Sequence, residues 1–233
     1  MTVSLHSLRA GYRALVIGAS GSIGQAFVQA LLADPRCASV QAVSRGHPLD
    51  WDLCDEASLE RLADRLEGPW HLVVDATGAL SVDAAGPEKR LQDLQAGRLQ
   101  RSLQINAVGP ALLLRYLSPQ LARGERVIWA KLSARVGSIE DNHKGGWYGY
   151  RAAKAALNQL LQTAAIELAR QRPLAVVAAL QPGTVRSALS RPFVGDDAMD
   201  PELSAQLLLQ VIDNLPAAGR AHFVDHAGQS IPW

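Results

Sequence analysis

The segment that most constrains the fold is a glycine-rich turn, GASGSIG, at residues 18–24. It follows a short apolar run, Arg13 to Gly18, that predicts a buried strand. It leads into a stretch, Ile23 to Ala33, that has the apolar spacing of a helix. Glycines at this place let the chain turn tightly, bring its backbone close to a ligand and pack the helix against the sheet. The turn therefore predicts a strand–turn–helix unit near the N-terminus.

The rest of the chain alternates short apolar runs with longer stretches of helical period, as parallel βαβ units do. Further strands are predicted at residues 39–43, 71–75, 126–132, 174–180 and 222–224, and further helices at 56–66, 147–170 and 201–215. Residues 87–121 are predicted to be mostly helical, with interruptions near Gly97 and at Gly109-Pro110. This order predicts an α/β fold with a Rossmann-like, doubly wound parallel sheet in three layers. A length of 233 residues fits a single domain that spans residues 1–233.

Charge and cysteine usage exclude several other classes of function. Lys and Arg number 23 and Asp and Glu number 22, so neither nucleic acid nor a membrane surface is an expected partner. No stretch approaches the roughly 18 apolar residues that cross a bilayer, and the N-terminus lacks a signal-peptide pattern. The two cysteines and His143 have no further ligand at metal-binding spacing, so no metal site is predicted. We expect a cytoplasmic protein.

The glycine turn and the end of the second strand together predict a dinucleotide site. The first amides of a helix and its partial positive charge stabilise phosphate oxygens, and Ser20 and Ser22 add hydroxyl donors. The second strand ends in Ser44-Arg45, where an acidic residue would instead bind a free ribose hydroxyl. A guanidinium clamps a 2′-phosphate with paired donors, so the sequence favours NADP over NAD. The alternatives are a purely structural turn and a solvated surface arginine.

Tyr150 and Lys154 lie four residues apart in the predicted helix 147–170, so both project from one face. A phenol titrates near pH ~10, too high for efficient proton exchange at neutral pH, and a neighbouring ammonium lowers that pKa. Such a pair can act as the acid in carbonyl reduction and as the base in alcohol oxidation. Taken alone the spacing is common by chance and fits a solvated helix better. Its value comes from the glycine turn upstream.

In combination these motifs resemble the short-chain dehydrogenase/reductase superfamily over nearly the whole chain. Asp52-Leu53 is similar to the family's acidic and apolar pair near the adenine, and residues 75–78 (DATG) stand in for its Asn-Asn-Ala-Gly segment. Residues 182–185 (PGTV) match the segment that folds over the nicotinamide. The resemblance and the residue patterns together imply cofactor contacts at Gly18, Ser20, Gly21, Ser22, Ile23, Gly24, Ser44, Arg45, Asp52, Leu53, Ala76, Thr77, Gly78, Tyr150, Lys154, Pro182, Gly183, Thr184 and Val185. A narrower likeness is to the carbonyl-reductase-like branch of sniffer-type and C-factor proteins.

The resemblance also implies a catalytic tetrad of Asn106, a serine, Tyr150 and Lys154. The family places the serine three residues before the catalytic-loop glycine, but Ala134 stands there, and the available hydroxyl is that of Ser133. Either the loop is one residue longer and Ser133 takes the tetrad position, or the serine role is lost. We expect the first, because Ser133 ends its predicted strand. Asp75 replaces the family's first asparagine, and a buried carboxylate there needs a hydrogen-bonding partner.

The implied reaction is hydride transfer between NADP(H) and a small carbonyl or alcohol substrate, with Tyr150 as proton donor or acceptor. Ser133 would help Tyr150 to bind the carbonyl, Lys154 would hold the nicotinamide ribose, and Asn106 would hold a relaying water. We expect the substrate pocket between residues 138–147 and 187–199, and a homodimer or homotetramer. One alternative is a nucleotide-sensing or partner-binding protein without turnover, motivated by the displaced serine. Another is an epimerase or dehydratase, which the short C-terminal region disfavours.

Overall fold

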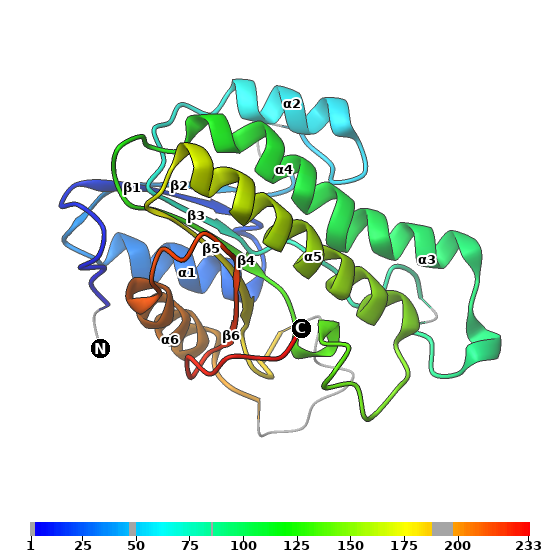
Figure 1. The fold of residues 1–233 in the computed structure, drawn as a ribbon. Coiled ribbons are helices and arrows are strands. Elements are labelled where there is room, and N and C mark those ends of the chain that lie inside the picture. Colours follow the sequence, from blue (N-terminus) through cyan, green and yellow to red (C-terminus); the bar gives the residue numbers. More distant parts are fainter. Residues whose placement is uncertain (1–2, 47–49, 85, 188–197) are drawn as a thin grey trace.

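A parallel sheet runs through the middle of the molecule (Figure 1). The computed structural model describes residues 3–46, 50–84, 86–187 and 198–233. Within these ranges the strands form one six-stranded sheet in the order β2-β1-β3-β4-β5-β6, and every adjacent pair is parallel. Their bounds are β1 (Tyr12–Ile17), β2 (Cys37–Val43), β3 (Leu72–Asp75), β4 (Val127–Leu132), β5 (Ala175–Gln181) and β6 (His222–Asp225). The predicted doubly wound parallel sheet is confirmed.

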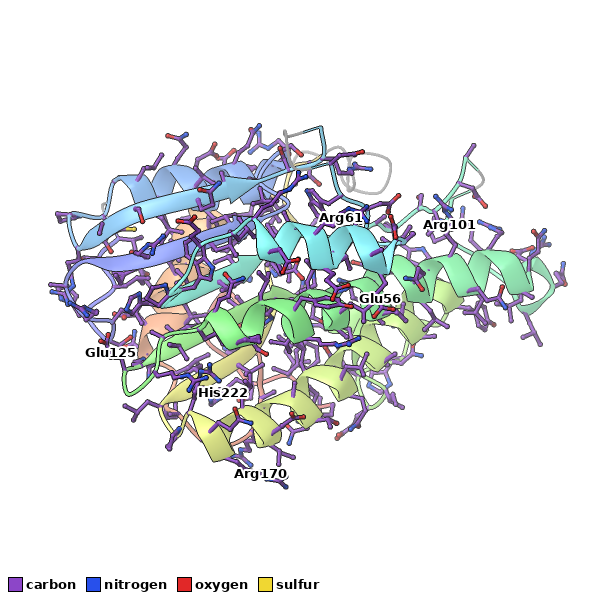
Figure 2. All side chains as sticks on the ribbon, turned by 90° about the horizontal axis from the view of Figure 1, so that it is seen from above. Glu56, Arg61, Arg101, Glu125, Arg170 and His222 are labelled. Atoms are coloured by element: carbon purple, nitrogen blue, oxygen red, sulfur yellow. The ribbon has the colours of Figure 1, made fainter. Side chains whose placement is uncertain are left out.

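Helices cover both faces of the sheet and complete the three predicted layers (Figure 1). One face carries α2 (Glu56–Asp64), α4 (Gly109–Leu117) and α5 (Tyr148–Gln171), and the other carries α1 (Ser22–Leu32) and α6 (Pro201–Asn214). In β4, Trp129 packs with the first group of helices, while Ile128 and Ala130 pack with the second. The strands are apolar throughout because both of their faces are buried. Seen from above in Figure 2, Arg61 and Arg170 lie on the exposed outer surfaces of α2 and α5.

The strand order brings two of the expected cofactor segments together. Strand β2 lies on one side of β1 and strand β3 lies on the other. The order in which strands are added to the sheet therefore reverses at β1. At such a switch point the loops after the two strands diverge and leave a crevice at their carboxyl ends. The glycine turn follows β1 and the Asp75–Gly78 segment follows β3, and Ala76 N donates to Ile17 O at 2.8 Å. Both segments therefore flank the crevice.

The structure corrects the helical prediction for residues 87–121. Between Pro87 and Gln95 the described chain makes only a short 3₁₀ turn, Leu91–Asp93, and helix α3 runs from Ala96 to Leu103. The preceding segment is held differently because Glu88 bonds to the start of α5, as described below. The Gly109-Pro110 pair does not break the helix either. A π-helical segment, Gln104–Val108, joins α3 to α4.

The wider π turn explains how the helix tolerates a proline. The amide of Gly109 bonds to the carbonyl of Gln104, five residues earlier. A proline ring clashes with the carbonyl four residues before it in a regular α-helix, and an inserted π turn relieves that clash. The remaining strands and helices begin and end within two residues of their predicted bounds. In the described ranges, no helix is long and apolar enough to cross a membrane.

Candidate active site

The glycine turn after β1 makes close approaches that only glycine permits. Gly18 has a left-handed φ of 82°, and a Cβ there would lie 3.0 Å from the backbone of Ala76 and of Thr77. A Cβ on Gly24 would lie 2.2 Å from the carbonyl oxygen of Gly18. Gly21 is the N-cap of α1 and makes no side-chain cap, so the first helix amides lack the usual side-chain acceptor. This shape suits a phosphate group, which such amides bind.

The expected ribose contacts lie beside this turn. Gly18 N and Ala19 N both donate to Val43 O, at 2.8 and 3.0 Å, so the end of β2 is bonded to the glycine turn. Ser44 and Arg45 follow immediately, the first half-buried and the second exposed. A guanidinium exposed at that edge has the donors that a 2′-phosphate requires.

The predicted adenine contacts differ in their exposure. Asp52 is exposed, and its carboxylate accepts a hydrogen bond from Cys54 N at 2.8 Å. Leu53 is half-buried against the core, and its carbonyl accepts a bond from Gln104 Nε2 at 3.2 Å. A Cβ on Gly109 would lie 2.7 Å from that same carbonyl, so this segment packs directly on the helix that contains Asn106.

Asn106 is buried in the π-helical segment and fixes the turn after β3. Its side-chain nitrogen donates to Ala79 O at 2.8 Å and to Ser102 O at 3.2 Å, and its oxygen accepts a bond from Ala79 N at 2.9 Å. A Cβ on Gly78 would lie 3.1 Å from Asn106 Oδ1 and 3.5 Å from Lys154 Nζ. The structure thus brings Asn106, Gly78 and Lys154 together.

Tyr150 and Lys154 project from α5 toward each other. Lys154 Nζ lies 5.6 Å from the centroid of the Tyr150 ring and donates to Leu132 O at 3.0 Å. The ring of Tyr150 also meets that of Trp147 edge to face, with centroids 6.4 Å apart. Lys154 is buried, and Tyr150 taken as a whole residue is half-buried. The pair is therefore adjacent, as its spacing predicted.

Burial controls the protonation of both groups. Burial raises the pKa of the Tyr150 phenol above its usual value. Burial, and after it the positive charge of Lys131, lower the pKa of Lys154 well below its usual value, while Asp75 opposes this shift. The expected lowering of the Tyr150 pKa by Lys154 is therefore wrong in direction, because desolvation of the phenol dominates. Tyr150 is a neutral phenol at neutral pH.

The segment after β5 lies at the same edge of the sheet. Gly183 has a φ of 83°, and a Cβ there would lie 3.1 Å from the ring of His226. Pro182 O accepts a bond from Ser204 Oγ at 2.8 Å, and Met199 N donates to Thr184 O at 2.8 Å. Thr184 is exposed and Val185 is buried. The Pro-Gly segment is thus fixed by Ser204 of α6 and by Met199, which lies just before that helix.

The two expected walls of the substrate pocket are described to different extents. Most of the second wall, residues 188–197, lies outside the described residues. The first wall, residues 138–147, is bonded to the last residue of the chain: Glu140 N donates to Trp233 O at 3.3 Å, and Ser138 Oγ does so at 3.4 Å. The structure therefore places the C-terminal segment against this loop (Figure 1).

Comparisons with known proteins identify the family. Residues 18–218 match a family model described as enoyl-(acyl carrier protein) reductase. The chain is a short-chain dehydrogenase/reductase. It is 30% identical over 166 residues to C-signal of Myxococcus xanthus, across 71% of this chain and 94% of that protein. It is also 30% identical over 186 residues to 1-hydroxy-2-glutathionyl-2-methyl-3-butene dehydrogenase of Rhodococcus sp. (strain AD45), across 78% of each.

Solved structures support the fold. The NADPH-bound carbonyl reductase from chicken fatty liver superimposes with a TM-score of 0.82 at 23% identity, over 98% of this chain and 97% of that one. Carbonyl reductase Sniffer of D. melanogaster gives a TM-score of 0.79 at 21% identity, over 96% and 99% of the two chains. The chain therefore belongs to an oxidoreductase family with a Rossmann-like fold.

This short-chain dehydrogenase/reductase departs from the family's pattern in carrying Ala134 where the tetrad serine is expected. Ser133 is buried and its hydroxyl donates to Asn158 Oδ1 at 2.6 Å. Asn158 lies eight residues beyond Tyr150 on α5, about 12 Å along the helix axis. The Ser133 hydroxyl is therefore engaged with Asn158, and its place in the tetrad stays a prediction.

A second departure is an ion pair that the sequence did not reveal. Lys131 and Asp75 are register partners on β4 and β3, and Lys131 Nζ lies 3.0 Å from Asp75 Oδ1. Both side chains are almost completely buried. The partner that a buried Asp75 requires is therefore a lysine in an otherwise apolar strand. Its only signal in the sequence is one charge within VIWAKL.

Glu88 is a further functional residue that sequence reasoning missed. Helix α5 begins after Trp147, which has a left-handed φ of 53° and no side-chain cap. Glu88, buried and 61 residues earlier than Gly149, accepts the Gly149 amide on its carboxylate at 3.1 Å. Its carbonyl accepts the Trp147 amide at 2.5 Å. Glu88 therefore caps the helix that carries Tyr150, and nothing local in the sequence announces this.

Proposed function

We propose that this chain is an NADPH-dependent reductase of small carbonyl compounds, with Tyr150 as the proton donor. The observation that carries the proposal is the adjacency of Tyr150, Lys154 and Asn106 next to the glycine turn and Arg45. The turn fits a dinucleotide because its amides lack a side-chain cap and its glycines leave no room for a Cβ. Arg45 would bind a 2′-phosphate, and the Pro182–Val185 segment would cover the nicotinamide end. When bound there, NADPH supplies the hydride.

The chain's own residues supply the proton. Tyr150 donates a hydrogen bond to the carbonyl oxygen and then its proton, because burial keeps it a phenol at neutral pH. A raised pKa also makes the phenol a weaker acid, so the phenolate left after proton transfer needs a stabilising neighbour. Lys154 stabilises the phenolate that results, and it would hold the nicotinamide ribose. Asn106 holds the Gly78–Ala79 backbone beside Lys154, which fixes the ammonium relative to the phenol.

The test compares two tyrosines on the same helix. Tyr150→Phe should lower kcat for NADPH-dependent carbonyl reduction by about 10²–10⁴-fold, because it removes the proton donor. Tyr148→Phe is the matched control and should keep wild-type activity. NADPH affinity, followed by its fluorescence, should be unchanged in Tyr148→Phe and should fall far less than kcat in Tyr150→Phe. Reduction that survives Tyr150→Phe at the wild-type rate would refute the proposed mechanism.

The contact between Ser133 and Asn158 favours a second candidate, a nucleotide-sensing or partner-binding protein that turns over no substrate. Position 134 carries a methyl group, so the site offers one fewer donor to a carbonyl oxygen than the family's tetrad. A wild-type protein that binds NADPH tightly, yet oxidises none of it with a broad panel of aldehydes and ketones, would favour this candidate.

We further propose that the chain assembles as a homodimer or homotetramer through the outer face of α5. Leu157, Leu161 and Ala165 are buried in the core, whereas Leu160 and Ile166 are 40% and 43% exposed on the same helix. Light scattering coupled to gel filtration would give the mass of the wild type. Leu160→Glu should convert the oligomer to a monomer, and an unchanged mass would exclude this face.

A further inference from the structure

The buried ion pair of Asp75 and Lys131 joins the central strands to the proposed proton-transfer group. We propose that this pair positions the Thr77–Gly78 turn against Asn106 and Lys154 and sets the charge that surrounds the Lys154 ammonium. The inference rests on the proposed function, because Lys154 is taken to act on Tyr150. Asp75 and Lys131 touch neither the phenol nor a substrate in this account, so they are positioning residues.

Within the described part of the chain, the hydrogen bonds of the Lys131 ammonium go to the end of β3 and the turn that follows. Its ammonium donates to Asp75 Oδ1 at 3.0 Å and Asp75 O at 3.3 Å, and to Thr77 O at 2.6 Å and Thr77 Oγ1 at 3.1 Å. Asp75 Oδ1 also accepts bonds from Thr77 N at 2.9 Å and Thr77 Oγ1 at 2.6 Å. Two charged side chains therefore hold the backbone of residues 75–77.

The next residue carries this constraint into the active site. Gly78 has a φ of 142° and lies so close to Asn106 Oδ1 and Lys154 Nζ that a Cβ would contact both. Lys154 in turn donates to the carbonyl of Leu132, the neighbour of Lys131 on β4. A shift of the 75–77 backbone would therefore move the groups on both sides of Lys154.

The two buried charges compensate each other only if both Asp75 and Lys131 are present. Asp75 Oδ2 is buried and has no hydrogen-bond partner in the described part of the chain. The two neutral donors of Thr77 reach only Oδ1, and the positive charge that pairs with this carboxylate is that of Lys131. Removing one member of a buried ion pair leaves an uncompensated charge, whereas removing both does not. A double variant is thus expected to recover much of what either single variant loses.

The charges around Lys154 predict that Asp75 and Lys131 shift its pKa in opposite directions. Lys131 on β4 and Asp75 on β3 both act on Lys154, the first lowering and the second raising its pKa. Tyr150, on the same helix, is neutral at neutral pH. The other nearby charges are engaged elsewhere: Arg135, on the turn packed against α5, pairs with Asp225 and Asp141, and Glu88 caps Gly149. The pair therefore dominates the electrostatic surroundings of Lys154.

The experiment compares Asp75→Asn, Lys131→Met and the double variant with the wild type. Each single variant should lower kcat/KM for carbonyl reduction by about 10²-fold, the scale expected when reacting groups shift by an ångström. The alkaline limb of kcat/KM should report Lys154, because the Tyr150 pKa is raised out of that range. Asp75→Asn should move this limb to lower pH and Lys131→Met to higher pH, each by about one unit. In the double variant, both kcat/KM and the pH of its alkaline limb should return toward the wild-type values.

Urea unfolding and NADPH fluorescence titration give readouts that need no turnover. Both single variants should unfold at lower urea concentration and the double variant close to the wild type. The exposed pair Glu56–Arg115, between α2 and α4, is the matched control, and its Glu56→Gln/Arg115→Met cycle should show little coupling. Singles that lose stability but keep the alkaline limb in place would reduce the pair to a structural element and overturn the inference. A wild type that turns over nothing would instead refute the proposed function, while the unfolding and titration cycles would still test the pair.

Discussion

Replacing Gly24 with alanine should destabilise the protein, and its comparison with Gly21→Ala should separate the packing of the glycine turn from its role in binding. The new Cβ would lie 2.2 Å from Gly18 O and 2.9 Å from Gly18 C, both backbone atoms that cannot rotate away. Ordinary contact requires the turn to move by about 1 Å. Overpacking of this kind costs up to about 3 kcal/mol, and alanine recovers about 1 kcal/mol over glycine within a helix. The net loss of about 2 kcal/mol corresponds to a fall in Tm of about 4–8 °C.

Gly21→Ala is the matched control on the same turn. Gly21 has a φ of −75°, which alanine adopts without strain, and a Cβ there would meet Gly18 O at an ordinary 3.5 Å. Its Tm should stay near that of the wild type. If the turn holds a pyrophosphate, both variants should weaken NADPH binding about tenfold or more, Gly24→Ala by displacing the amides and Gly21→Ala by crowding the ligand. Calorimetric melting and fluorescence titration measure the two effects. Unchanged NADPH affinity in both variants would refute the assignment of the turn.

Three further outcomes are expected. Arg45→Ala should weaken NADPH binding about 10–100-fold, the value of charge-assisted bonds to a phosphate, and leave NADH binding unchanged in the same titration. Glu88→Ala should lower the free energy of unfolding by about 1–2 kcal/mol and reduce kcat, while Glu88→Gln, which keeps an acceptor for Gly149, should lose less. Urea unfolding should show stability that rises with pH toward about 10, because the unfolded chain binds protons that buried Lys131 and Lys154 release. Above that pH it should fall, since buried tyrosines keep protons that the unfolded chain loses; a flat profile from pH 7 to 10 would contradict the lowered lysine pKa values.

The fold was predictable because its signals are local. Each strand buried on both faces is a short apolar run, and each helix has its own period and start, as at Asp55, whose carboxylate caps α2 through the Ala57 amide. The glycine turn then fixes the first unit and the parallel connection. The adjacency of Tyr150 and Lys154 was also predictable, because a spacing of four residues within one helix determines it.

Glu88 and its segment were not predictable in this way. The composition of residues 87–95 fits a helix as well as a loop, and a capping contact across 61 residues has no periodic signature. The predicted direction of the Tyr150 pKa shift was wrong for a related reason. The spacing shows that an ammonium is near, but only the packed structure shows that Lys154 is buried and that desolvation raises the pKa of Tyr150.

Strand alternation explains both the contact that Ser133 makes and the position of the unexpected lysine. Side chains two residues apart on a strand point to the same face. On β4, Trp129 packs with α2, α4 and α5, so Lys131 faces the same layer, and Ser133, which continues the β5 register through its bond to Leu180 O, does as well. The same rule on β3 places Asp75 with Val73, toward Lys131. Ser133 therefore meets Asn158 on α5, and Lys131 meets Asp75 beneath Lys154. The face of the strand therefore determines which hydroxyl and which charge lie on the α5 side of the sheet, and the spacing along the catalytic loop does not reveal it.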